Sequence, residues 1–183
     1  AEKVRFTSQN EIGIAGANYG TDGQVLTSGG AGAAVAWEDA AGGGKVLQVI
    51  HVEDTTQASS TATGFTDLSI SAAITPSDSS SKVLVIMSGV ASSDSTANLI
   101  RGKIYRDESA VSAKFEMAGY NAGSSDKSYD IWSANYLDSP STTSEVTYSI
   151  RVSVLDGETY YVGRWAYDGT SSPTQITLME IGA

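Results

Sequence analysis

The stretch "EVTYSIRVSV", residues 145–154, alternates apolar and polar side chains along almost its whole length. Successive side chains of a β-strand point to opposite faces, so a period of two predicts a strand with one buried face. The buried set would be Val146, Tyr148, Ile150, Val152 and Val154, and the outward set Thr147, Ser149, Arg151 and Ser153.

Similar segments continue on both sides of this stretch. The inward set of 66–74 would be Leu68, Ile70, Ala72 and Ile74, and that of 110–118 would be Val111, Ala113, Phe115 and Met117. The runs "KVLQVIHV" (45–52) and "KVLVIMSGV" (82–90) are almost continuously apolar, which favours strands covered on both faces. Further strands are expected at 98–106, 128–137, 158–165 and 174–181.

No segment after residue 44 has a convincing helical period, and all three prolines fall between the expected strands. About nine strands separated by turn residues are typical of an antiparallel β-sandwich of the jelly-roll type. We therefore predict an all-β chain with one sandwich domain over residues 45–183.

Residues 1–44 differ from the rest of the chain in composition and in the spacing of their apolar residues. Ten of the 19 glycines lie there, and apolar residues come in short pulses that predict strands of three to five residues. Such strands bury too little apolar area to offset the ordering of their backbone. Copies of the same chain wound about a shared axis would supply the missing surface, so 1–44 is predicted to be an intertwined shaft or neck. The pulses are Val4 with Phe6, Ile12 with Ile14, Val25 with Leu26, and Val35 with Trp37.

Charge and composition narrow the classes of partner. The chain of 183 residues has a net charge of −10 and a sequence pI near 4.4, so it repels nucleic-acid phosphates and anionic lipids. No stretch approaches the ~20 apolar residues of a membrane span. Cysteine is absent, which removes disulfides and fits assembly in a reducing cytoplasm. We expect neither nucleic acid nor membrane insertion.

The usual catalytic and metal-binding patterns are missing. His51 is the single histidine and lies within an apolar run, where a satisfied or interface-lining side chain is expected. One histidine without cysteine cannot form the usual zinc sites. We expect no catalytic residue, no metal and no cofactor. Distant carboxylates can still converge in a fold, so a polysaccharide-cleaving enzyme stays open as an alternative.

Two segments carry the residue types that bind sugars. Trp and Tyr rings pack against sugar rings, while Asp, Asn and Arg supply hydrogen bonds. The alternative is that the aromatic residues fill the sandwich core or a subunit interface. The candidate receptor-binding residues are Tyr120, Asn121, Asp126 and Tyr129 in "AGYNAGSSDKSYD" (118–130), and Arg164, Trp165, Tyr167 and Asp168 in "RWAYDGTSS" (164–172).

The stretch "YGTDGQVLTSGGAGAAVAWEDAAGGGKVLQV" (19–49) resembles a segment of tail fibres and related receptor-binding proteins of tailed bacteriophages. There, "GxxGQVLTSxGxGxxxxW" precedes a globular tip. The likeness continues in order through "FTDLSISAAITPSDSSSKVLVIMSGV" (65–90), "YLDSPSTTSEVTYSIRV" (136–152) and "TQITLMEIGA" (174–183). Its leading "EKVRFTSQNEIGI" (2–14) is similar to the strand repeats of fibre shafts.

This resemblance implies a homotrimeric virion appendage, attached to other virion proteins of a tail or capsid. Residues 1–44 would form its trimerising shaft or neck and 45–183 its tip. The tip would bind a host-surface glycan or protein without acting as an enzyme. An architectural capsid or collar fibre, or a decoration protein without receptor binding, remains the alternative.

Overall fold

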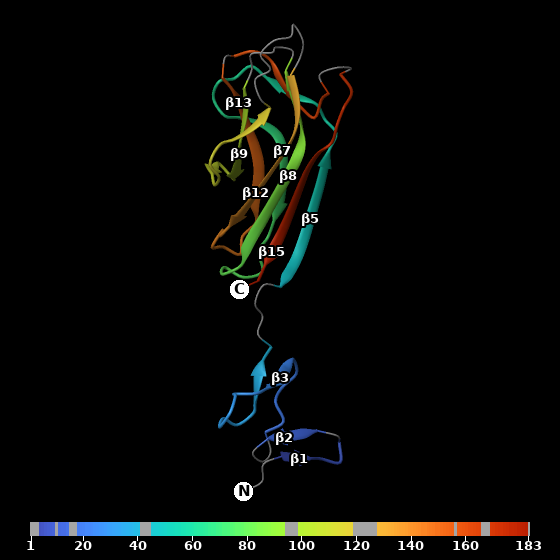
Figure 1. Ribbon diagram of the computed structural model, residues 1–183, viewed down its shortest axis with the longest axis vertical. Coiled ribbons are helices and arrows are strands. Elements are labelled where there is room, and N and C mark those ends of the chain that lie inside the picture. The colour runs from blue at the N-terminus through green and yellow to red at the C-terminus, as the bar shows by residue number, and fades with distance from the viewer. Residues whose placement is uncertain are drawn as a thin grey trace. The chain divides into compact units, whose positions relative to one another are not determined.

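The computed structural model describes residues 4–9, 11–14, 18–40, 45–93, 99–118, 128–155, 157–165 and 169–182. The chain divides into two compact units, Ala1–Gly43 and Gly44–Ala183 (Figure 1). All regular elements in the described ranges are strands, as the sequence predicted. The trimeric, intertwined neck expected for the first unit stays a prediction.

The first unit consists of two small antiparallel hairpins. One pairs β1 (Val4–Phe6) with β2 (Ile12–Ile14), and the other pairs β3 (Gln24–Thr27) with β4 (Ala36–Asp39). Each strand contains apolar residues of one of the predicted pulses. Among the described apolar side chains of this unit, only that of Ile14 is buried. The hairpins therefore bring very little core of their own.

The first sheet of the second unit is built around its longest strand, β8 (Lys82–Ser93). One edge of β8 pairs with β15 (Thr174–Ile181) and then β14 (Tyr160–Val162), and the other edge pairs with β12 (Ser128–Asp138). Beyond β15 lies β5 (Val46–Asp54), and beyond β14 lies β6 (Ala58–Ser60). All these pairs are antiparallel.

The second sheet has the order β10 (Ser109–Ala110), β9 (Ile100–Arg106), β13 (Val146–Val154), β7 (Thr66–Ile74). The strand β11 (Phe115–Ala118) also pairs with β9, and every pair is antiparallel. Inward side chains of both sheets form one hydrophobic core, as expected of a β-sandwich. The five residues predicted to face inward on β13 are all buried, but Ser149 and Ser153, which were predicted to face outward, are buried as well.

Three further details differ from the predictions. The expected strand 110–118 is split, because Ile104 bonds to Val111 and to the Ser112 hydroxyl where a longer strand would continue its ladder. Ala113 is consequently exposed. The strand β6 was missed because its sequence, "ASS", has no apolar pattern.

The third difference concerns strands predicted to be covered on both faces. On β5, Leu47 and Val49 are 48% and 53% exposed, and on β8 Ile86 is 37% exposed. Toward the start of β8, the described residues leave the outer face of this sheet largely uncovered, whereas Ser92 at the other end of the strand is buried. The apolar outer face is therefore a surface feature of the second unit.

Candidate functional site

The structure brings the two predicted sugar-binding segments together. Tyr129 lies at the start of β12, and Trp165 follows the end of β14. Both Tyr129 and Tyr161 are opposite Ser92, on the two edges of β8, so the two segments meet at the same end of that strand. The rings of Tyr129 and Trp165 are in edge-to-face contact, with centroids 5.7 Å apart and planes at 72°.

Hydrogen bonds fix the backbone next to this aromatic pair. The Ser92 hydroxyl donates to the carbonyl of Arg164 (2.8 Å). The Gln57 amide donates to the carbonyl of Gly169 (2.9 Å) and to the Ser171 hydroxyl (3.0 Å). The Arg164 guanidinium lies 3.9 Å from the ring centroid of Tyr161, which is a cation–π contact.

The eight sequence candidates divide into two groups. Tyr129, Arg164 and Trp165 lie together, and Tyr129 is 53% exposed, so its ring is accessible to a ligand. The other five, Tyr120, Asn121, Asp126, Tyr167 and Asp168, lie outside the described residues.

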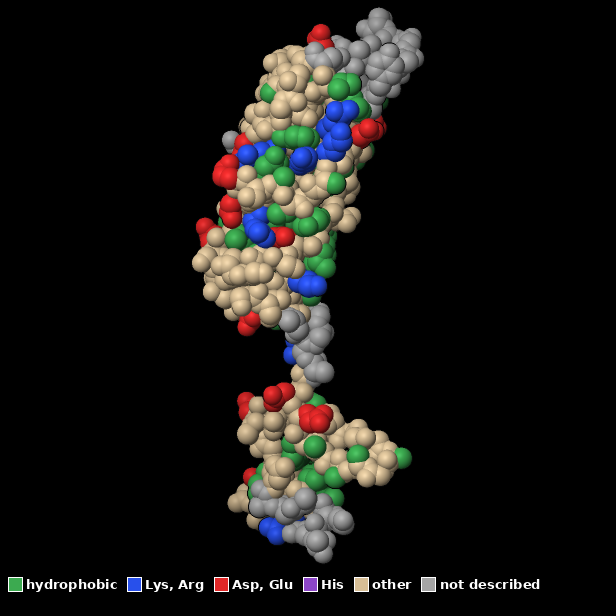
Figure 2. Space-filling view, turned by 90° about the vertical axis from the view of Figure 1, so that its left-hand side faces the viewer, with side chains coloured by type: hydrophobic (Ala, Val, Ile, Leu, Met, Phe, Trp, Pro, Cys, Tyr) green, Lys and Arg blue, Asp and Glu red, His purple; other side chains and the backbone are tan. Residues whose placement is uncertain are grey.

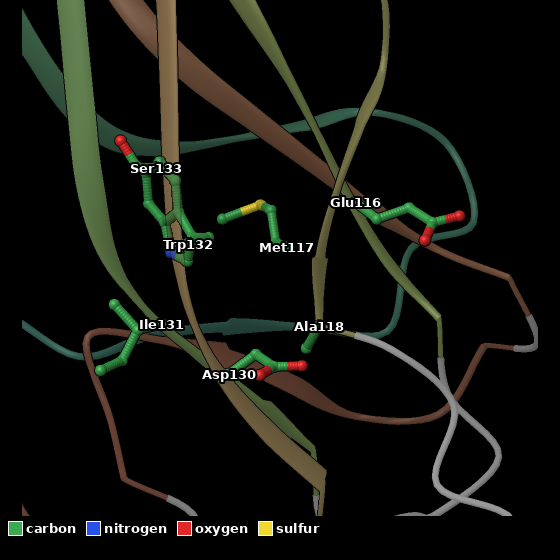
Figure 3. A pocket seen from close by; sticks show the side chains of 7 residues that line it. All are labelled: Glu116, Met117, Ala118, Asp130, Ile131, Trp132 and Ser133. Atoms are coloured by element: carbon green, nitrogen blue, oxygen red, sulfur yellow. The ribbon is translucent and has the colours of Figure 1, made fainter.

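A cavity of about 380 Å³ lies between β11 and β12, and the sequence analysis did not predict it. These strands belong to different sheets, so the cavity occupies a seam at one edge of the sandwich. Figure 3 shows the Asp130 side chain reaching toward Ala118 and the Glu116 carboxylate pointing away from β12, while Met117 lies between β11 and the Trp132 indole. Its lining residues are Glu116, Met117, Ala118, Asp130, Ile131, Trp132 and Ser133.

The floor of this cavity depends on close packing over Gly102 in β9. A Cβ atom at Gly102 would lie 2.6 Å from the Phe115 ring and 2.8 Å from the Met117 sulfur. Because glycine has no Cβ atom, the Phe115 and Met117 side chains can pack closely against β9 at this position. The Phe115 and Trp132 rings then pack with centroids 6.2 Å apart, and Trp132 is only 3% exposed. Trp132 thus belongs to the core, the alternative that the sequence left open for it.

The Trp132 indole nitrogen is buried, and no hydrogen-bond partner is found for it among the described residues. Buried donors of this kind are rare in native structures. Two exposed carboxylates, Glu116 and Asp130, line the same cavity. Carboxylates and a buried aromatic core residue therefore share the lining of this cavity.

Basic side chains lie close to the cavity. Glu116 is opposite Arg101 in the β9–β11 register, and a smaller hollow of about 170 Å³ is lined by Arg101, Lys114, Phe115 and Glu116. Figure 2 shows Lys and Arg side chains gathered on the side of the unit where β9 and β13 lie. Of the basic residues of β9, Lys103 lies 4.7 Å from the Phe65 ring centroid, and Arg106 pairs with Asp138.

A further surface is the outer face of the first sheet. There Val49, Met179, Leu84 and Leu137 lie directly opposite one another across β5, β15, β8 and β12, and we call these four residues the apolar row. Val49 and Leu137 are each about half exposed, at 53% and 51%. In the adjacent row, His51 is exposed, with Nδ1 2.9 Å from the Thr177 hydroxyl.

The described residues contain no cluster of three or more His, Asp or Glu side chains arranged to hold a metal ion. In the same part of the chain, none of the elements is a helix with the length and apolarity to cross a membrane.

Comparisons with known proteins assign no family. No family model matches the sequence, and the curated proteins give no match. Two solved structures of infectious bursal disease virus are similar at 15% identity. The alignment with the Gt strain structure covers 98% of this chain at a TM-score of 0.39. The alignment with the Gx strain structure covers 86% of this chain at a TM-score of 0.37. The chain spans 46% of the length of each of those proteins.

Proposed function

We propose that this chain is a virion structural protein, a phage fibre that assembles as a homotrimer and binds a host-surface receptor, a glycan, through its second unit. The observation that carries the proposal is the apolar surface that a single chain leaves exposed on both units. Phe6 is 75% exposed in the first unit, and Leu137 is 51% exposed in the second. Figure 2 shows hydrophobic side chains at the surface of the first unit.

Isolated two-stranded hairpins are marginal in water, and large exposed apolar patches usually mark interaction surfaces. Identical copies would bury both kinds of surface at once. The order of sequence motifs from 19 to 183 supports the same assignment, because it resembles phage fibres with a shaft and a tip.

The strand order supports a jelly roll as the form of the sandwich. The eight principal strands, taken in chain order, are β5, β7, β8, β9, β11, β12, β13 and β15. Numbered from one to eight, they form one sheet in the order 1-8-3-6 and another in the order 2-7-4-5. Jelly rolls occur in viral capsid and lectin domains, so this fold is compatible with both a structural and a sugar-binding role.

The receptor role is supported by the exposed Tyr129 ring beside Trp165 and Arg164. Aromatic faces next to a guanidinium are suited to sugar rings and their hydroxyls. Three weak sites held on one trimer would gain affinity by avidity.

The proposal is tested by mass and by binding. Sedimentation of the purified chain should give a trimer, and the labelled trimer should bind whole cells of a susceptible host. Tyr129→Ala and Trp165→Ala should reduce cell binding by about tenfold or more, as expected for exposed aromatic anchors. Tyr105→Ala, on the outer face of the second sheet, is the matched control.

The other functions give different outcomes. Attachment to virion particles without any cell binding would favour an architectural capsid or collar protein. New reducing ends after incubation with host capsule would favour a depolymerase. A stable monomer would contradict the proposal directly.

A further inference from the structure

We propose that the smaller hollow, lined by Arg101, Lys114, Phe115 and Glu116, binds the carboxylate of an acidic saccharide, a sugar of the uronic-acid class. Arg101 and Lys114 would hold the carboxylate, and Glu116 would accept a hydrogen bond from a sugar hydroxyl. The inference rests on the proposed receptor role and names the chemical class of the glycan, at a site that none of the eight sequence candidates includes.

Basic side chains are concentrated on the second sheet. The chain has 11 Lys and Arg residues against 21 Asp and Glu residues, yet five of the 11 lie on β9, on β13 or just before β11. These five are Arg101, Lys103, Arg106, Lys114 and Arg151. Figure 2 shows Lys and Arg side chains gathered on this side of the unit. Positive charge is therefore gathered locally in an acidic protein.

The five cations differ in how far their charge is balanced. Arg106 and Arg151 each form an ion pair with a carboxylate. The Lys103 ammonium lies 4.7 Å from an aromatic ring centroid, a contact that leaves its positive charge in place. In the described part of the chain, no ion pair is found for Arg101 or Lys114. The hollow thus has two cations without a paired carboxylate.

A neighbouring cation raises the positive potential at the hollow. Arg101 and Lys103 lie on the same face of β9, two residues apart, so their Cα atoms are separated by about 7 Å. Like charges at this spacing repel each other, and a bound anion would relieve the repulsion. Salt screens the negative charge of remote parts of the chain over about 8 Å, so nearby cations dominate at contact. The hollow therefore attracts an anionic group although the chain has a net charge of −10.

Glu116 restricts the charge of the ligand. It is exposed, lies opposite Arg101 in the β9–β11 register and lines the same hollow, and Figure 3 shows its carboxylate pointing away from β12. Two cations and one carboxylate give the lining a net charge of +1, which suits a singly charged carboxylate better than a phosphate dianion. The Glu116 carboxylate can also accept a hydrogen bond, so a ligand that carries hydroxyl groups beside its carboxylate matches both kinds of group.

Size and lining favour the acidic end of a sugar. The hollow measures about 170 Å³, whereas sites that enclose a whole ligand commonly begin at about 300 Å³. It therefore takes one charged end and leaves the rest of the ligand on the open surface. A guanidinium such as that of Arg101 can bind a carboxylate through two parallel hydrogen bonds. The half-buried Phe115 ring is the apolar part of the lining, on which the C–H groups of a sugar can pack.

The experiment follows the arginine side-chain N–H signals of the full chain by ¹⁵N NMR, with the Arg101 signal assigned by its loss in Arg101→Gln. The probes are D-galacturonate and D-glucuronate, compared with their uncharged methyl esters and with acetate. At least one uronate should shift the Arg101 signal, and its methyl ester and acetate should bind at least tenfold more weakly. Lys114→Gln should weaken uronate binding by about tenfold, the effect of losing one charged hydrogen bond.

Lys82→Gln is the matched control, because it removes the same charge from an exposed residue at the start of β8. It should leave the uronate response unchanged, and thermal unfolding checks that each variant is folded. No Arg101 shift with either uronate at about 100 mM, enough to saturate a millimolar site, would overturn the proposal. Equal losses in Lys82→Gln and Lys114→Gln would do the same, and an equal response to acetate would overturn the assignment to a saccharide.

Failure here is distinguishable from failure of the receptor role. Cell binding that depends on Tyr129 and Trp165, with no uronate response at Arg101, overturns the assignment of the hollow alone. A uronate response that Lys114→Gln weakens, without any cell binding by the trimer, supports the hollow and overturns the receptor role.

Discussion

Glu180 is a buried carboxylate whose charge is balanced by donors. Its side chain is 0% exposed, and it accepts hydrogen bonds from the Ser77 backbone N–H (2.8 Å), the Ser77 hydroxyl (2.7 Å) and the Gln48 amide (2.7 Å). Burial alone would raise the pKa of Glu180, but the hydrogen bonds outweigh it and lower the pKa to about 2.

This lowered pKa predicts a loss of stability in acid. The pKa of Glu180 is about 2 in the folded state and 4.5 as a reference for the unfolded chain, so the unfolded chain binds more protons between these values. The stabilisation is complete above about pH 4.5 and is lost as the pH falls toward 2. It amounts to roughly 3 kcal/mol, and urea unfolding measured across this pH range checks it.

The matched comparison uses Glu180→Gln and Glu53→Gln. Glu180→Gln should remove most of the dependence on pH, leaving contributions such as that of Asp78, whose pKa is lowered by hydrogen bonds from Ser80. Glu53→Gln, on the exposed face of β5, should keep it. An equal pH slope in the Glu180→Gln protein would contradict the assignment.

A second buried network predicts unequal effects at its members. The hydroxyl of Tyr148 and the guanidinium of Arg106 both donate to the same oxygen of Asp138, at 2.7 and 2.5 Å. Tyr148→Phe leaves the ion pair intact and should cost about 1 kcal/mol of unfolding free energy. Asp138→Ala leaves a buried hydroxyl and a half-buried guanidinium unmatched, and should cost about 3 kcal/mol or more.

Chemical denaturation of both variants checks this difference. Equal losses in the two proteins would mean that Asp138 contributes little beyond its contact with Tyr148.

At the scale of elements, the alternation of side chains predicted some strands very well. The bounds of β7 match the predicted 66–74, and β13 begins one residue inside the predicted 145–154, because the apolar residues of each strand recur with a period of two. The pattern failed at 110–118, where every second residue is apolar but the ladder along β9 is interrupted between Ala110 and Phe115. A local pattern cannot register an interruption that is set by hydrogen bonds to another strand.

The two candidate sites differ in how much of each could be predicted from the sequence. Tyr129 and Trp165 were predicted from composition alone, since binding loops share a recognisable mixture of residues. The cavity depends on β11 and β12 joining different sheets, and on a register shift between Glu116 and Ala118. These are properties of pairing over long distances, and no local signal encodes them.

The apolar row predicts self-association through the first sheet. Leu137 is 51% exposed in a single chain, so a charged residue there should change the stability of that chain little. If copies bury the row, a desolvated charge would oppose their association. Leu137→Glu should therefore weaken the oligomer by about tenfold or more in sedimentation equilibrium, relative to Ser71→Glu on the other sheet. Equal association of the two variants would exclude the row from the interface.

At the scale of the whole molecule, the two units differ in the amount of hydrophobic core that stabilises them. The second unit has a continuous core that draws on both sheets, including fully buried Tyr148, Tyr160 and Leu178. The first unit buries one apolar side chain, Ile14, in its described part. The second unit should therefore fold by itself, whereas the first needs a partner surface.

Deletion of residues 1–44 tests this division. The remaining chain should keep its β-sheet circular dichroism and a cooperative unfolding transition, because its core is complete without the first unit. If the chain is the trimer that we propose, the shortened protein should dissociate at higher protein concentration than the full chain, since the apolar pulses of the first unit are gone. Sedimentation over a range of concentrations measures the difference, and an oligomer of unchanged stability would contradict a trimerising first unit.

Combining this deletion with Leu137→Glu separates the two contributions to assembly. If the first unit and the apolar row act independently, their effects on the association free energy should add, and the shortened variant should be a folded monomer. A trimer that survives both changes would place the interface elsewhere on the second unit. Loss of folding in the combined variant alone would mean that its sandwich depends on association for its stability.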